Sequence, residues 1–213
     1  MTTAHTSNAT AASSRPESRD IIRARQKRLG QLYASEPAAA WVTDCARTSY
    51  RADDPLHTAV IFGPGEPSGV PIALHSAVGG ESDEAVAGDI LSGALATCID
   101  STLRAVARRL RVELEALSVE VRAEVDVRGT LCLDPQVPVG FQRMSARVEL
   151  RCAPGTPVAK RRIMVQTVEH CCVVLRTLQQ GVRVDTRFED ETRAESSPTS
   201  DASTGEERDD VHA

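Results

Sequence analysis

The stretch that decides the fold of this chain is residues 88–98, GDILSGALATC, an apolar segment that ends in a cysteine. Residues with the spacing of one helix face recur around it at intervals of three and four; they are Leu91, Leu95, Cys98, Thr102 and Val106. This period is that of a helix with one buried side. The sequence therefore predicts a long helix over residues 86–112, with Cys98 about three turns inside it on the apolar face.

A second helix with cysteines at a corresponding depth is predicted further along the chain. The Thr-Pro pair at 156–157 is typical of a helix start, an N-cap followed by a proline in the first turn. The apolar stripe continues through residues 164–178, and Gly181 suits the position after the helix end. Cys171 and Cys172 lie in this stretch. If the two helices pack side by side, sulfurs from both could meet, which a disulfide requires.

Strand patterns precede the first helix. Residues 40–46 and 58–62 are rich in strand-forming side chains, with a turn at 51–55 between them. Residues 70–74 form a candidate third strand, which Pro71 restricts to a sheet edge because proline donates no ladder hydrogen bond.

The segment between the two helices predicts an antiparallel pair. Residues 117–127 and 143–152 alternate apolar and polar side chains, as half-buried strands do. Residues 182–188 are expected to close the fold as a last strand. The order β-β-(β)-α-β-β-α-β places the chain in the α+β class rather than among alternating α/β folds.

Composition bounds the domain organisation. The 213 residues suffice for one domain with a real core, and aromatic content is only 3%. We expect residues 1–34 to be disordered or partly helical, residues 35–189 to form the domain, and residues 190–213 to be a disordered acidic tail. The net charge is −5 and neither sign dominates the middle, so no nucleic-acid or membrane partner is predicted. Without a secretory signal or a long apolar run, the expected location is the cytoplasm.

Most of the six cysteines are expected to be free thiols that pack as small hydrophobic side chains, but the placement of Cys98 and of the cysteines on the second helix favours thiol redox chemistry. A thiolate is a nucleophile, and a second thiol can recover the first after oxidation. Zinc is the rival, through His170 and the two cysteines after it, but neighbours on a helix point about 100° apart and no C-x-x-C spacing occurs. We therefore expect no metal and no cofactor. His57, His75 or His170 could assist a cysteine nucleophile, and spacing selects none of them.

Two motifs resemble those of the OsmC/Ohr family, the organic hydroperoxide resistance and osmotically inducible protein C-like proteins. Residues 88–104 are similar to the helix that carries that family's first cysteine. Residues 172–178, CVVLRTL, resemble its second motif, usually written C-P-V-x-x-T-L. The predicted element order also matches over roughly residues 40–189.

This resemblance implies a fold, an activity and roles for two residues. The fold would be an intertwined homodimer, with two sheets around long central helices. The activity would be reduction of organic hydroperoxides or hydrogen peroxide in the oxidative stress response, sustained by a dithiol reductant. Matching positions make Cys98 the peroxidatic cysteine and Cys172 the resolving one. Cys171 would be an extra, packing thiol.

The chain departs from the family pattern at three places. A glutamate usually lies ten residues before the first cysteine, where this chain has Gly88, followed by an aspartate. The family's activating arginine comes from the N-terminal strands, where Arg47 and Arg51 are candidates. Val173 replaces the usual proline. The missing glutamate favours an alternative, a non-catalytic OsmC-like domain that binds a small ligand or a partner, whereas retention of Cys98 and Cys172 opposes it.

Overall fold

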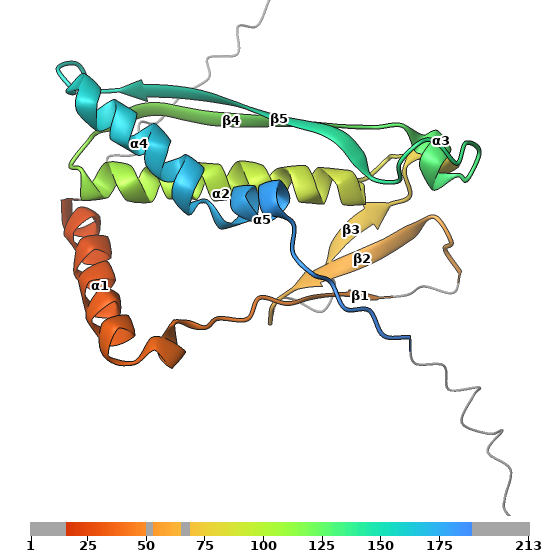
Figure 1. The fold of residues 1–213 in the computed structure, drawn as a ribbon, viewed down its shortest axis with the longest axis horizontal. Helices are drawn as coiled ribbons and strands as arrows, with labels where there is room; N and C mark the ends of the chain where they lie inside the picture. Colours follow the sequence, from red (N-terminus) through yellow and green to blue (C-terminus); the bar gives the residue numbers. More distant parts are fainter. Residues whose placement is uncertain (1–15, 50–52, 65–68, 189–213) are drawn as a thin grey trace, which may run out of the picture. The chain divides into compact units, whose positions relative to one another are not determined.

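The computed structural model describes residues 16–49, 53–64 and 69–188, with side chains from residue 21 onward (Figure 1). Residues up to Gly181 form one unit, and Val182–Ala213 form a second. The elements in the described ranges, with η for a 3-10 helix, are α1 (Pro16–Ser35), η1 (Pro37–Ala40), β1 (Ala46–Ser49), β2 (His57–Phe62), β3 (Val70–Ala73), η2 (Ser76–Val78), α2 (Ala87–Arg109), β4 (Leu114–Val125), α3 (Val127–Thr130), β5 (Phe141–Cys152), α4 (Val158–Cys171) and α5 (Val173–Gln180).

The long central helix predicted from the sequence is present as α2. The Asp89 carboxylate accepts a hydrogen bond from the Val86 backbone N–H at 3.0 Å, which satisfies one of the free donors at the helix start. Arg108 and Arg109 occupy the last turn, where the helix dipole favours cations. By length and composition α2 could also cross a membrane, a test that the core helix of a soluble protein passes as well.

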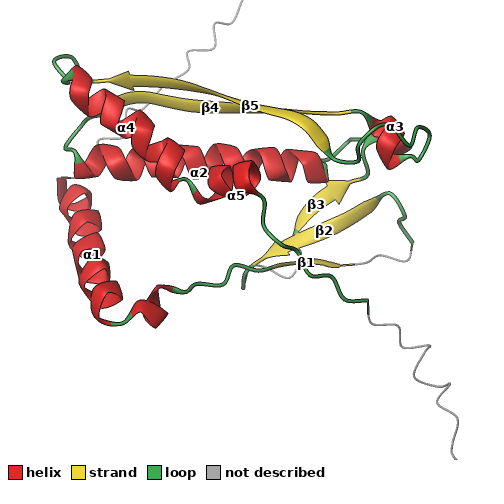
Figure 2. Ribbon diagram, viewed as in Figure 1, coloured by secondary structure: helices red, strands yellow, loops and turns green. Residues whose placement is uncertain are grey.

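The predicted antiparallel pair is also confirmed, as β4 and β5. Val119 lies opposite Val148 in the register, and β4 packs along α2 (Figures 1 and 2). The strand β4 ends at Val125, two residues earlier than predicted. There the Asp126 carboxylate accepts from the Arg128 backbone N–H at 3.1 Å and starts the short helix α3.

The N-terminal strands form a separate sheet of order β1-β2-β3 (Figure 2). The strand predicted at 58–62 is confirmed as β2, and β3 is an edge strand that contains Pro71, as expected. The strand predicted at 40–46 is wrong: β1 begins only at Ala46, opposite Phe62. Trp41 and Val42 have strand propensity but no partner strand, and they are 88% and 77% exposed. The turn predicted at 51–55 lies partly outside the described residues.

The second helix is broken where the sequence predicted continuity. Cys172 has extended backbone angles, φ −72° and ψ 109°, and separates α4 from α5. The predicted N-cap at Thr156 is wrong, because its hydroxyl donates to the Ala153 carbonyl at 2.7 Å instead. Gly181 ends α5 with a φ of +72°, the left-handed region that glycine tolerates best. The predicted helix end is therefore confirmed.

The predicted last strand is wrong. The described part of the second unit, residues 182–188, contains no helix or strand. A strand pattern yields a strand only where a partner completes its hydrogen bonds. The predicted domain boundaries at residues 34/35 and 189/190 stay predictions.

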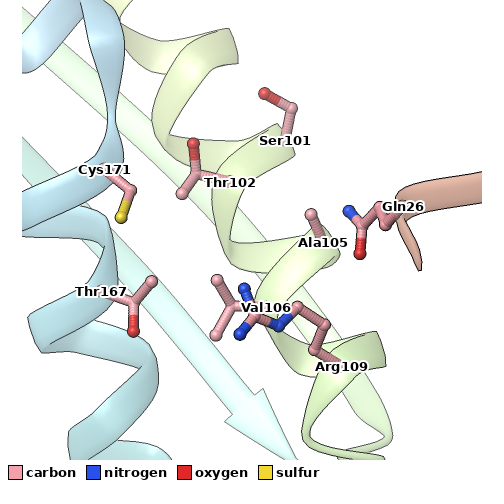
Figure 3. Close-up of a pocket in the computed structure, with 8 residues that line it drawn as sticks. All are labelled: Gln26, Ser101, Thr102, Ala105, Val106, Arg109, Thr167 and Cys171. Atoms are coloured by element: carbon pink, nitrogen blue, oxygen red, sulfur yellow. The ribbon is translucent and has the colours of Figure 1, made fainter. Parts of the chain in front are cut away.

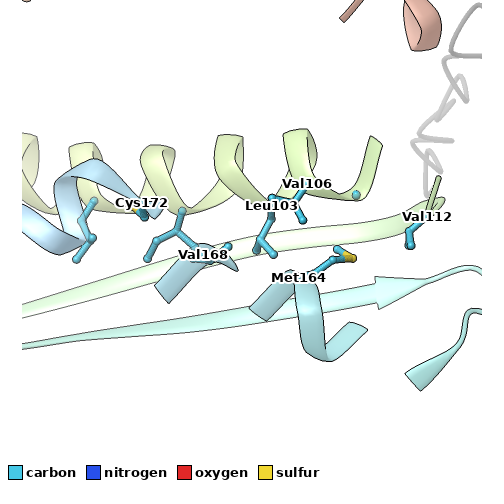
Figure 4. Close-up of a cluster of buried hydrophobic side chains, with 9 residues drawn as sticks. Leu103, Val106, Val112, Met164, Val168 and Cys172 are labelled. Atoms are coloured by element: carbon cyan, nitrogen blue, oxygen red, sulfur yellow. The ribbon is translucent and has the colours of Figure 1, made fainter. Parts of the chain in front are cut away.

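The core lies between α2, the β4–β5 pair and the α4–α5 segment (Figure 4). It is a cluster of buried aliphatic and sulfur side chains, namely Leu95, Ile99, Leu103, Val106, Ala107, Val112, Met164, Val168 and Cys172. The buried face of α2 is thus rotated slightly from the predicted stripe. Cys98 and Thr102 lie at its edge and are half-buried, which leaves the Cys98 thiol between the core and the surface.

Candidate active site

Two predicted site residues, Cys98 and Cys172, are brought together by the fold. Cys98 lies in the middle of α2 and is half-buried, whereas Cys172 lies at the α4–α5 junction and is fully buried. Both α4 and α5 pack on α2. The break in the second helix therefore places Cys172 where its sulfur meets the central helix.

The electrostatics of the pair follow from this placement. Burial raises the pKa of the Cys172 thiol, and the neighbouring Cys98 thiol raises it further. Backbone N–H groups at Leu175 and Val174, in the first turn of α5, act in the opposite direction. Because burial is the largest effect, Cys172 remains a protonated thiol at neutral pH.

The backbone around Cys98 is braced by hydroxyl groups one turn further along α2. The Thr102 hydroxyl donates to the Cys98 carbonyl at 2.7 Å, and the Ser101 hydroxyl donates to the same oxygen at 3.1 Å. These bonds hold the helix turn that carries the cysteine. Chemically, a half-buried thiol and a fully buried thiol thus lie near one another between α2 and the α4–α5 junction.

None of the histidines considered from the sequence is hydrogen-bonded to either cysteine in the described part of the chain. His57 is held between Asp54 and Asp83, with ring nitrogens 3.0 Å and 2.9 Å from their carboxylates. The His75 ring accepts from the Ala77 backbone N–H at 2.9 Å. His170 is exposed on α4. Within the described residues no three metal-binding side chains form a cluster.

Cys171 is not the packing thiol that the sequence predicted. It is exposed and lines a pocket of about 330 Å³ between α1, α2 and α4 (Figure 3). Sequence patterns did not predict this pocket. The sequence did contain a sign of it. A second face of α2, beside the buried one, carries residues at every fourth position, namely Ser101, Ala105 and Arg109.

Comparison with known proteins shows which family has this fold. The family model described as OsmC-like protein matches residues 80–187, half of the chain, including both cysteines.

The chain belongs to the OsmC-like protein family.

Two solved structures with TM-scores of 0.50 and 0.51 agree with the fold of an OsmC-like protein. An OsmC-like protein from Mycoplasma pneumoniae matches with a TM-score of 0.50 at 12% identity, over 66% of this chain and 89% of that one. An OsmC-like protein of unknown function from Vibrio cholerae matches with a TM-score of 0.51 at 9% identity, over 64% and 94% of the two chains. An organic hydroperoxide resistance protein from Legionella pneumophila gives a TM-score of 0.45 at 14% identity, over 66% and 92%. No curated protein matches the chain.

The OsmC/Ohr resemblance leads one to expect a glutamate at position 88, but a neighbouring aromatic ring leaves little room there for a side chain. A Cβ atom at Gly88 would lie 3.1 Å from the ring of Phe141 on β5. A longer side chain would require that ring to move. The neighbouring Asp89 does not stand in, since its carboxylate caps α2 through Val86. The glycine at position 88, in place of the family's glutamate, is therefore matched by the Phe141 ring on β5, which occupies the space beside it.

The activating arginine expected from the same resemblance is not found beside Cys98. Arg47 is exposed on β1, and its guanidinium donates to the Gly63 carbonyl at 3.5 Å. Arg51 lies outside the described residues. Across the described ranges no arginine is hydrogen-bonded to Cys98.

Proposed function

We propose that this OsmC-like protein is a thiol-dependent peroxidase that reduces organic hydroperoxides through Cys98 and Cys172. The observation that carries the proposal is the contact between an accessible thiol and a buried one at the junction of three helices. A thiol that reacts with peroxide needs access, and a thiol that resolves the product needs proximity.

The chemistry proceeds in two balanced steps. Cys98 loses its proton, and the thiolate attacks the terminal oxygen of the hydroperoxide. The O–O bond breaks, the terminal OH group stays on the sulfur as a sulfenic acid, and the leaving alkoxide takes up the proton that Cys98 released and departs as an alcohol. The resulting sulfenic acid condenses with the Cys172 thiol, which forms a disulfide and releases water. A dithiol reductant then reduces the disulfide and is itself oxidised to a disulfide.

The state of Cys172 supports this division of roles. A buried and protonated thiol does not compete for peroxide, so Cys98 reacts first. The same burial keeps the reductant from the Cys172 sulfur. The exposed part of the disulfide is therefore the Cys98 sulfur, and we expect the dithiol to attack there.

The surroundings of Cys98 favour an organic substrate. Cys98, Val174 and Leu175 pack at the edge of the aliphatic core. An apolar organic group gains free energy from contact with such a surface, whereas hydrogen peroxide does not. We expect activity in the oxidative stress response, in the cytoplasm.

A homodimer is part of the proposal. Large apolar side chains on both sheets and on α1 are exposed in the single chain, including Phe62, Val70, Leu29 and Val148. Exposed apolar surface of this extent is typical of an interaction site. An intertwined second copy would cover it and could supply the cation that Cys98 lacks here.

The test is peroxide consumption by the purified full chain. We expect faster turnover of cumene hydroperoxide than of hydrogen peroxide, and turnover with dithiothreitol but little with 2-mercaptoethanol, since a dithiol releases the mixed disulfide intramolecularly. Equal rates with both peroxides would contradict the substrate class. Absence of even stoichiometric consumption would contradict the activity.

The alternative, a non-catalytic ligand- or partner-binding domain, has one observation in its favour. Phe141 packs against Gly88, where the family pattern has a glutamate. The same assay separates the two functions, because a binding domain consumes no peroxide beyond slow surface thiol oxidation, which Cys98→Ser leaves unchanged.

A further inference from the structure

The pocket beside Cys171 has the composition of a ligand site distinct from the cysteine pair. Its volume is about 330 Å³, within the range of small-molecule sites. It is lined by side chains from α1, α2 and α4, namely Gln26, Ser101, Thr102, Ala105, Val106, Arg109, Thr167 and Cys171 (Figure 3). We call it the α1 pocket. Helix α1 precedes the family match at residues 80–187, so this chain builds the pocket partly from a segment outside that match.

The hydroxyl groups in the α1 pocket already donate their protons elsewhere. Ser101 and Thr102 donate to the Cys98 carbonyl, and Thr167 donates to the Ile163 carbonyl at 2.7 Å. The polar donors that remain are the guanidinium of Arg109 and the amide of Gln26. Neither has a hydrogen bond or ion pair within the described residues. Two donors without acceptors therefore border one small cavity.

The charge around the α1 pocket is positive. Arg109 is the one charged residue of its lining, and none of the lining side chains is a carboxylate. The nearby stretch 21–35 of α1 contains Arg23, Arg25, Lys27 and Arg28 and no acidic residue. On α2, Asp100 is engaged with Arg104 at 2.6 Å. An anion would thus meet a guanidinium that has no partner among the described residues, without a competing carboxylate in the lining.

We propose that the α1 pocket binds a small aliphatic monocarboxylate. Its carboxylate pairs with the Arg109 guanidinium, whose forked donors match two carboxylate oxygens. Its aliphatic body lies on Ala105 and Val106, next to the Cys171 thiol. At about 30 Å³ for a water-sized group, the cavity holds roughly a dozen non-hydrogen atoms, a size that octanoate fits. The site does not use the disulfide chemistry of Cys98 and Cys172, so it stands or fails separately from the peroxidase.

The test uses octanoate and the reduced full chain. Calorimetry is expected to give a one-to-one complex, and octanoate is expected to slow iodoacetamide labelling of Cys171 in peptide mapping. Arg109→Gln should weaken octanoate binding about tenfold or more, because it removes charge-assisted hydrogen bonds. The same variant should leave binding of 1-octanol unchanged. Ala105→Leu, which fills the cavity, should weaken both ligands.

The matched control is Arg122→Gln, which removes the same charge from an exposed ion pair with Glu120 on β4, outside the lining. It should bind octanoate like the unmodified chain. The proposal is overturned if octanoate does not bind, if Arg109→Gln binds it as tightly as Arg122→Gln does, or if octanoate protects Cys98 rather than Cys171.

Discussion

The fully buried thiol of Cys172 lies against the half-buried thiol of Cys98, where the α4–α5 junction meets α2. The two sulfurs differ in access although they are neighbours. An oxidant from solvent therefore reaches Cys98 first, and the product is formed beside a second thiol.

Treatment of the reduced chain with one equivalent of cumene hydroperoxide should yield a Cys98–Cys172 disulfide, because the fold makes these two thiols neighbours. Peptide mapping by mass spectrometry under non-reducing conditions would show the cross-linked peptides. Cys171→Ser is the matched control and should give the same product, since Cys171 faces the α1 pocket. A Cys171–Cys172 product, or no cross-link in folded protein, would contradict the assignment.

Substitution of the two cysteines should have unequal effects. Cys98→Ser should abolish peroxide turnover. Cys172→Ser should still consume about one equivalent and then stop or over-oxidise, because the sulfenic acid lacks its resolving thiol. Stopped-flow consumption with a sulfenic-acid trap distinguishes these outcomes. If both variants lose the first equivalent completely, the proposed roles are wrong.

The thermal stability of the chain should fall as pH rises from about 6.5 to about 9. Asp83 and then Asp54 raise the pKa of His57 to about 9 through side-chain hydrogen bonds, above the ordinary value of about 6.5. A raised pKa means that the protonated ring is favoured in the folded state. Its stabilising effect is complete below pH 6.5 and is lost through pH 9.

Asp83→Asn should reduce this pH dependence, measured as Tm across the same range. Glu81→Gln is the control: an exposed carboxylate in the same loop, without a hydrogen bond in the described part of the structure. It should leave the slope unchanged. A slope that is equal in Asp83→Asn and the unmodified chain would show that His57 is not the titrating group.

Truncation of Met164 should be costly. Its side chain is fully buried between α4 and the central helix, so Met164→Ala should lower the free energy of unfolding by about 2–5 kcal/mol. Met164→Leu keeps most of the volume and should cost less than about 1.5 kcal/mol. Denaturant unfolding followed by circular dichroism measures both. Equal effects of the two substitutions would mean that cavity formation is not the cause.

The chain should be a stable dimer at micromolar concentration. Removal of residues 1–15 and 189–213, which are poor in large apolar side chains, should leave the dimer and its Tm nearly unchanged. Light scattering of both forms gives the mass in solution. A folded monomer at this concentration would refute the intertwined assembly.

Local sequence patterns determined most of the elements. The three-and-four spacing around Cys98 predicted α2, and period-two alternation predicted β4 and β5. These predictions hold because a helix or a half-buried strand repeats its buried face at a fixed interval. The motifs around Cys98 and Cys172 together indicate the OsmC-like family from the sequence alone.

Tertiary structure alone decided which strand-like segments form strands and where the second helix breaks. Residues 41–44 and 182–188 have strand composition, yet neither range belongs to a strand. The sequence pattern did not predict the helix break at Cys172, because the apolar stripe continues across it. Packing on α2 fixed the direction change that brings Cys172 to Cys98 and turns Cys171 outward into the α1 pocket. Sequence period records which face of an element is buried, whereas contact between elements far apart in the chain depends on how those faces meet in space.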